Sequence, residues 1–306
     1  MLESNSLDKW IQDTQNQVNI EKNWNDFYKK CPTNRYETFF DADYEIWLNA
    51  VMDYLAKNEW KENIWIDELS QIEAEGAIKL CWIKKGDLIL NVPCGRWRHD
   101  LHFISKWINV VWWDSNLLVI KKAKDNLTSR ELKQNMLDWK NKRWKIKYET
   151  IHMNDIHYTN TFDVVTNLMY SIGYYPNDDE NKKVLQEFYK SLKQWGKLII
   201  QTSVPLDKAE KWYYDKVQRT ELLDSRKLLI QKQYDLESKK MNWIWTFFSK
   251  HWEMLKQQYY STQIYSDQDF ENNLKEVWFK DIHIYGNRQW AKRIPFDSNV
   301  IIVAHK

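Results

Sequence analysis

Short apolar segments alternate with helical segments from Asp87 onward, and this alternation constrains the fold more than any other feature of the chain. The first apolar segment, Leu88–Val92, runs into Pro-Cys-Gly, which is typical of a buried strand that ends in a turn. Further strands are expected at Asn109–Trp113, Lys145–Ile151, Phe162–Leu168 and Lys197–Thr202, with helices at Leu101–Lys106, Leu117–Asn126 and Glu180–Leu192. The pattern predicts an α/β fold with a mainly parallel sheet and helices on both faces.

The segments on either side of this alternation have a different character. Residues 1–80 read as an N-terminal helical extension or lid, with helices expected at Leu7–Phe27, Asp43–Leu55 and Ile66–Leu80. Residues 81–306 form the main domain, which ends in a helix at Asp267–Glu276 and strands at Phe279–Tyr285 and Val300–Ala304. Within it, residues 226–265 are rich in aromatic and β-branched residues and predict a small antiparallel β insertion.

Composition excludes several classes of function. Lys+Arg 45 against Asp+Glu 43 leaves a formal net charge of +2, so a dedicated nucleic-acid binder is not expected. No apolar run reaches the ~18 residues of a membrane span, and the polar N-terminus lacks the apolar centre of a signal peptide, so we expect a cytoplasmic protein. The three cysteines and the histidines show no spacing typical of disulfides or a metal site.

Two residues at strand ends point to a nucleoside ligand. Gly95 lies in the turn after the first strand, where a glycine lets a ligand approach the backbone closely. Asp114 follows Asn91 by 23 residues and ends the second strand. An ionised aspartate offers only acceptors, so it could bind both hydroxyls of a ribose.

Several segments then resemble the class I S-adenosylmethionine (SAM)-dependent methyltransferases. Leu88–His99 is similar to their motif I, Asp-x-x-Cys-Gly-x-Gly-Arg-His, and Val110–Asp114 is similar to their second strand, which ends in an acid. The resemblance continues through Phe162–Tyr174, Val184–Ile200 and Val277–Tyr285. It implies a Rossmann-like seven-stranded methyltransferase sheet, SAM as cofactor, and methyl transfer to an N or O nucleophile of a small-molecule acceptor.

The same resemblance implies a set of cofactor-binding residues but no catalytic base. They are Asn91, Pro93, Cys94, Gly95, Trp97 and Arg98 in the first loop, Asp114 and Ser115 after the second strand, Met153 and Asn154 after the third, and Asn167 and Leu168 after the fourth. The family has an acid for the cofactor's amino group where this chain has Asn91. Arg98 and His99 match its Gly-Arg-His, beside the cofactor's carboxylate.

Two other functions stay open at this point. A NAD-dependent oxidoreductase shares the first strand and turn, although the third glycine of its Gly-x-Gly-x-x-Gly falls at Asp100. A non-catalytic binding protein that has lost the cofactor would explain Trp97 and Asn91.

For the enzyme, we expect the helices before residue 60 and the 226–265 sheet to close the cleft, with Tyr36 and Phe39 near the active site.

Tryptophan stands where glycine is expected. The chain has 6 glycines and 19 tryptophans, whereas average glycine usage of ~7% predicts about 21 glycines. By the family pattern, glycine belongs at Trp82, Trp97, Trp107, Trp112, Trp195 and Trp278, which are tight turns or close approaches. Some bacterial lineages read the codon UGA as glycine, and another common code reads it as tryptophan. We therefore hypothesise that the natural protein has glycine at most of these positions.

Overall fold

A computed structural model describes residues 66–95, 99–117, 119–121, 146–168, 171–202, 204–211, 217–222, 224–286, 291–297 and 299–306. The expected helices at Leu7–Phe27 and Asp43–Leu55, together with Tyr36 and Phe39, lie outside these residues. Within the described part, no helix is long and apolar enough to cross a bilayer.

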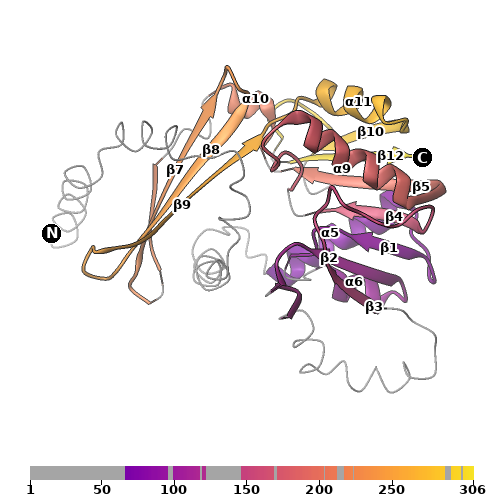
Figure 1. Cartoon of the computed structure of the whole chain (residues 1–306), viewed down its shortest axis with the longest axis horizontal. Helices are drawn as coiled ribbons and strands as arrows, with labels where there is room; N and C mark the ends of the chain where they lie inside the picture. The colour runs from indigo at the N-terminus through magenta and orange to yellow at the C-terminus, as the bar shows by residue number, and fades with distance from the viewer. Residues whose placement is uncertain are drawn as a thin grey trace.

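The central sheet is mainly parallel, as the alternation predicts. Its strand order is β11-β10-β12-β5-β4-β1-β2-β3, and β3, β2, β1, β4 and β5 pair in parallel (Figure 1). The strands are β1 (Leu88–Asn91), β2 (Asn109–Asp114), β3 (Ile146–Thr150), β4 (Phe162–Asn167), β5 (Leu192–Thr202), β10 (Lys280–Gly286), β11 (Ala291–Lys292) and β12 (Val300–His305). The expected count of seven is too low, because the two-residue strand β11 adds an eighth at the edge.

Helices cover both faces of this sheet, as predicted. Successive residues of β2 alternate between the two cores: Val111 and Trp113 pack on the side of α9 (Asp178–Ser191) and α11 (Asp267–Glu276). Val110 and Trp112 pack on the side of α5 (Ile66–Cys81) and α6 (Asp100–Ser105). This alternation follows from the two-residue period of a strand.

Helix α5 packs under the sheet. Its Ala74, Ala77 and Cys81 are fully or almost fully buried among residues of β1, β2 and β5. The small side chains of the two alanines let the helix approach the strands closely. The expected domain boundary at residue 80 therefore cuts off a helix that belongs to the packed core of the sheet.

Between α10 (Leu206–Ala209) and α11, the chain forms a second sheet of four antiparallel strands. Its strands are β6 (Val217–Glu221), β7 (Lys227–Asp235), β8 (Lys240–Phe248) and β9 (Met254–Gln263), and the three long ones reach away from the central sheet (Figure 1). The sequence does not predict β6, because its five residues show no alternation of apolar and polar side chains. In the structure, only one of the five is buried.

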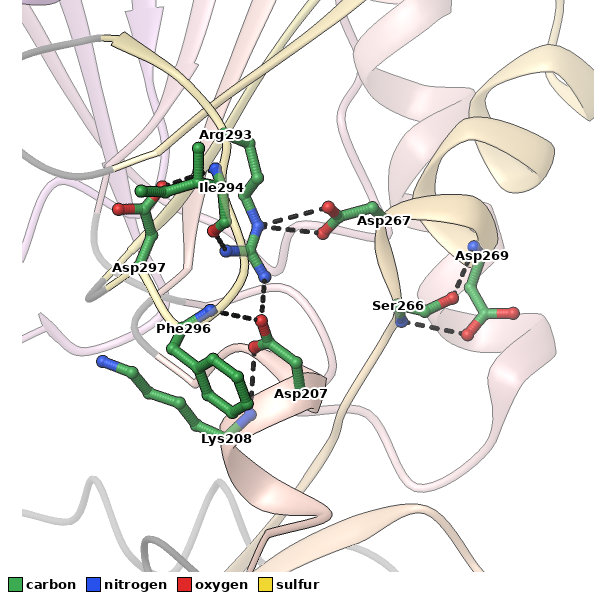
Figure 2. A network of polar contacts seen from close by, with 9 residues as sticks. All are labelled: Asp207, Lys208, Ser266, Asp267, Asp269, Arg293, Ile294, Phe296 and Asp297. Carbon is green, nitrogen blue, oxygen red and sulfur yellow. Dashed lines mark hydrogen bonds and ion pairs between the residues drawn. The ribbon is translucent and has the colours of Figure 1, made fainter.

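Arg293 joins the two ends of this insertion. Its guanidinium lies 3.1 Å from a carboxylate oxygen of Asp207 on α10 and 3.2 Å from Asp267, the first residue of α11 (Figure 2). The Arg293 side chain is 9% exposed, so both ion pairs are poorly screened by solvent on its side. The segment between β11 and β12 thus ties together the points where the chain leaves and re-enters the central domain.

Five tryptophans adopt a left-handed backbone that strongly favours glycine. They are Trp82, Trp107, Trp195, Trp252 and Trp278, with φ between 55° and 72°, among ten such non-glycine residues in the described part. A bulky residue with positive φ is an outlier. Four of the indoles are also exposed, from 40% at Trp107 to 82% at Trp195.

These backbone angles support the glycine hypothesis at four of the six expected positions and add Trp252, which the family pattern did not predict. Trp97 lies outside the described residues. Trp112 differs from the others because it lies inside β2, does not have positive φ, and buries its whole side chain. Only a close approach, and not a turn, could require glycine there.

Candidate functional site

The predicted site residues gather where parallel strands end. Asn91 is the last residue of β1, Asp114 of β2 and Asn167 of β4, and these strands are neighbours in the sheet. Ligands of open α/β sheets bind outside the carboxyl ends of the strands. Ten of the twelve predicted residues lie at this edge or in the loops that follow it, and Trp97 and Arg98 lie outside the described part.

Asp114 closes the turn after β1. Its Oδ2 accepts a hydrogen bond from the Gly95 amide at 3.0 Å, and its Oδ1 accepts one from the Asn116 amide at 2.9 Å. The Cys94 amide donates to the Trp113 carbonyl at 2.7 Å, which ties the turn to the end of β2 a second time. Gly95 has φ of 51°, so the turn uses its conformational freedom. The carboxylate is thereby held at the junction of the two strands.

Asn167 connects three segments at the same edge. Its Nδ2 donates to the Val92 carbonyl at 2.7 Å and lies 3.6 Å from the Met153 sulfur. The Asn154 amide in turn donates to the Tyr175 hydroxyl at 3.3 Å, which links the loops after β3 and β4. The Asn167 Oδ1 is buried and accepts no hydrogen bond from the residues that the structure describes, so it offers an acceptor at the end of β4.

Two predicted site residues have their side chains in the core. Cys94 and Leu168 are fully buried on the α5 and α6 side of the sheet, so only their backbones can face a ligand. Burial raises the pKa of the Cys94 thiol well above its usual value, and the nearby Asp114 and Asp100 raise it further. The thiol therefore stays protonated and is a poor nucleophile.

Asp100 is a residue of this edge that the sequence identifies only as the place of a missing glycine. Asn91 Nδ2 donates to Asp100 Oδ1 at 2.7 Å, and the Thr166 hydroxyl donates to Asn91 Oδ1 at 3.0 Å. All three side chains are completely buried. The only sequence signal for this pair is that Asp100 follows Asn91 by nine residues. That spacing indicates a contact only when α6 is known to fold against the end of β1.

His99 contacts α5. Its Nε2 lies 2.8 Å from Glu73 Oε2, and Gln201 Nε2 donates to Glu73 Oε1 at 3.0 Å. Glu73, His99 and Gln201 are each at most 1% exposed, so the contact is deep in the domain. This network joins α5, the loop before α6, and β5. The position of His99 favours a role in holding the first loop over one beside the carboxylate of a cofactor.

The loop after β4 contacts the four-stranded sheet. The Gln263 amide at the end of β9 donates to the Gly173 carbonyl at 2.8 Å, and Lys240 Nζ donates to the Pro176 carbonyl at 2.8 Å. Gly173 has φ of 98°, and an added Cβ would lie 2.3 Å from the Gln263 carbonyl oxygen, so no larger residue fits there. The Tyr174 ring lies 5.9 Å from that of Tyr260 on β9, and burial raises the pKa of Tyr174.

Among the described residues, no group of three or more His, Cys, Asp or Glu side chains is placed to hold a metal ion. The polar groups that the structure places at this edge are carboxyl groups, side-chain amides and backbone groups around the turn.

Of the comparisons with known proteins, the one with solved structures identifies the fold. No protein-family model and no curated protein matches the chain. Among solved structures, a SAM-dependent methyltransferase from Clostridium acetobutylicum is similar, with a TM-score of 0.64, 16% identity, and 84% of this chain and 98% of that chain covered.

Two further solved structures belong to the same group. The CcbJ methyltransferase from Streptomyces caelestis has a TM-score of 0.63 and 10% identity, covering 77% of this chain and 88% of that chain. An amino pentose methyltransferase from Micromonospora echinaspora, solved with SAM bound, has a TM-score of 0.60 and 12% identity, covering 87% and 97%. The chain thus has the Rossmann-like fold of the class I SAM-dependent methyltransferases.

Proposed function

We propose that this chain transfers a methyl group from SAM to a nitrogen or oxygen nucleophile of a small molecule. The observation that carries the proposal is the position of Asp114 at the end of β2, where its carboxylate closes the turn through Gly95. An ionised carboxylate has about four acceptor sites, so one that already accepts backbone amides can also serve the two hydroxyls of a ribose. The similarity to methyltransferase folds supports SAM as the nucleoside.

The residues at this edge fit such a cofactor. Asp114 would hold the ribose, and Met153 and Asn154, in the loop after β3, would lie beside the adenine. The buried Oδ1 of Asn167, which accepts no hydrogen bond within the described part of the chain, offers an acceptor at the end of β4. SAM supplies a methyl group already activated on a sulfonium, so the protein's task is to align the acceptor with it. Proximity and orientation then account for much of the rate enhancement.

We further propose that residues 1–60 and the four-stranded sheet cover the acceptor. The contacts of Gln263 and Lys240 with the loop after β4 support this, because they fix one end of that sheet beside the proposed site. Closure of such a cover would exclude water and position the acceptor.

A titration with SAM, S-adenosylhomocysteine and NAD tests the cofactor. The titration is run in the chain as written and in a Trp97→Gly background. We expect the first two ligands to bind and NAD not to bind; tight binding of NAD, or no binding of SAM in either background, would contradict the proposal. An acceptor screen then follows the formation of S-adenosylhomocysteine. Amino sugars enter the screen first, because one similar structure is an amino pentose methyltransferase. Binding without turnover of any acceptor would favour the non-catalytic alternative.

A further inference from the structure

Asp100 is a fully buried acid with half of its carboxyl group engaged. Oδ1 accepts a hydrogen bond from Asn91 Nδ2 at 2.7 Å, whereas Oδ2 has no hydrogen-bond partner among the described residues. Its side chain is 0% exposed. A buried carboxylate normally requires a cation or several donors around it, since an unpaired buried charge is very unfavourable.

The chain supplies no cation to Asp100 in its described part, where no ion pair to Lys, Arg or His involves this acid. Burial raises the pKa of Asp100 well above its usual value, and the hydrogen bond from Asn91 lowers it again only in part. Burial thus favours the protonated form of the acid, and a cation placed beside it would favour the ionised form.

The place of Asp100 in the fold points to the ligand edge. Asn91, its hydrogen-bond partner, is the last residue of β1 and leads directly into the turn that Asp114 closes. Asp100 and Asp114 are both close enough to Cys94, in that turn, to raise the pKa of its thiol. Two acids thus flank the turn. Asp114 accepts hydrogen bonds from the amide of Gly95 in the turn and the amide of Asn116 after β2, whereas the bonded oxygen of Asp100 accepts from a side chain.

Asn91 cannot supply a charge itself. Its amide donates to Asp100 and accepts from Thr166, so both ends of the amide have a defined role in orienting the acid. SAM, in contrast, carries two positive charges, on its ammonium and sulfonium groups. Pairing of the buried acid with one of them would offset the unfavourable burial of both.

We propose that Asp100, oriented by Asn91, supplies the negative charge that pairs with the ammonium group at the amino-acid end of SAM. This inference rests on the proposed function, because it takes SAM as the ligand. Asp100 is then a specificity-determining residue that distinguishes SAM from uncharged nucleosides, and Asp114 binds the ribose that the two share.

Calorimetric titration with SAM and with adenosine, which lacks the charged end, tests the assignment. Asp100→Asn keeps the shape and the hydrogen bond from Asn91 but removes the charge. We expect it to weaken SAM binding about 10- to 100-fold, the usual loss of a charge-assisted hydrogen bond, and to leave adenosine binding unchanged. The matched control is the exchange variant Asn91→Asp with Asp100→Asn, which restores the acid 2.7 Å away and should recover most of the SAM affinity.

Proton release gives a second readout. Titrations in buffers of different ionisation enthalpy should show proton release when SAM binds the unaltered chain, because a cation favours the ionised acid, and less release with Asp100→Asn. All titrations are run in the chain as written and in a Trp97→Gly background, so that the indole in the first loop cannot hide binding.

The outcomes separate the two proposals. If Asp100→Asn binds SAM as tightly as the unaltered chain, or loses SAM and adenosine to the same extent, the inference about Asp100 is wrong and the proposed function stands. If SAM binds in neither background, the proposed function is wrong and this inference falls with it.

Discussion

Trp195 offers the sharpest test of whether glycine belongs at the positive-φ tryptophans. It lies in β5 with φ of 68°, and the residue is 82% exposed. Trp195→Gly and Trp195→Ala remove the same indole, so their difference in stability isolates the backbone. A side chain in the left-handed region costs about 1–2 kcal/mol, and the greater freedom of glycine in the unfolded chain offsets about 0.4–1 kcal/mol of that. We therefore expect the glycine variant to be about 1 kcal/mol more stable than the alanine variant.

Trp243 is the matched control. It lies in β8 and does not have positive φ, so glycine should there be about 0.5–1 kcal/mol less stable than alanine. The sign of the difference between glycine and alanine is thus expected to reverse between the two sites, whatever each indole contributes by packing.

Equilibrium unfolding in urea measures both differences. With a slope of about 2 kcal/mol per M, a 1 kcal/mol change moves the midpoint by about 0.5 M. An alanine variant at position 195 as stable as the glycine variant would refute the conformational reasoning. Codons supply the independent check: the hypothesis requires UGA at the positive-φ tryptophans, and UGG at all of them would eliminate it.

Four further predictions concern the site and its surroundings. Asp114→Ala should weaken SAM binding by about 1–3 kcal/mol, because it removes a hydrogen-bonded charge; unchanged affinity in calorimetry would contradict its assignment to the ribose. Arg293→Met should remove the ion pairs with Asp207 and Asp267 and lower the free energy of unfolding by about 1–2 kcal/mol, less than for a fully buried pair because both acids are partly exposed. Limited proteolysis should then cleave residues 217–263 faster. An unaltered cleavage rate would argue against a role of Arg293 in holding the two ends of the insertion. Cys94, whose thiol pKa is raised by burial, should resist alkylation at pH 8 until the chain unfolds. Rapid alkylation of Cys94 in the native protein, detected by mass spectrometry, would contradict its burial. Deletion of residues 1–42 should abolish formation of S-adenosylhomocysteine while far-UV circular dichroism still reports a folded sheet; a fully active truncation would rule out the proposed cover.

Local sequence patterns predicted the helices and strands well where a chemical signal marks their ends. The helix at Asp267–Glu276 has its expected bounds, and a capping box formed by Ser266 and Asp269 explains where it starts. The helix expected from Glu180 begins two residues earlier, because Asn177 accepts a hydrogen bond from the Glu180 amide and caps it. Strand β11 escaped prediction, since two residues are too few to show a period.

The sequence alone determined the order of strands and helices, and with it the edge at which Asn91, Asp114 and Asn167 meet, because parallel strands joined by helices must end on the same side. It also indicated glycine at four of the tryptophans that prove to have positive φ. These conclusions needed only local periodicity, turn chemistry and the spacing of motifs.

The tertiary structure alone decided which polar groups are partners. Asp100 meets Asn91 only when α6 folds back over the end of β1, and Glu73 reaches both His99 and Gln201 only when α5 packs under the sheet. Glu73 and Gln201 lie 128 residues apart in the chain, and a hydrogen bond extends over about 3 Å. No periodicity records so long a separation, so these partners follow from the packing of whole elements.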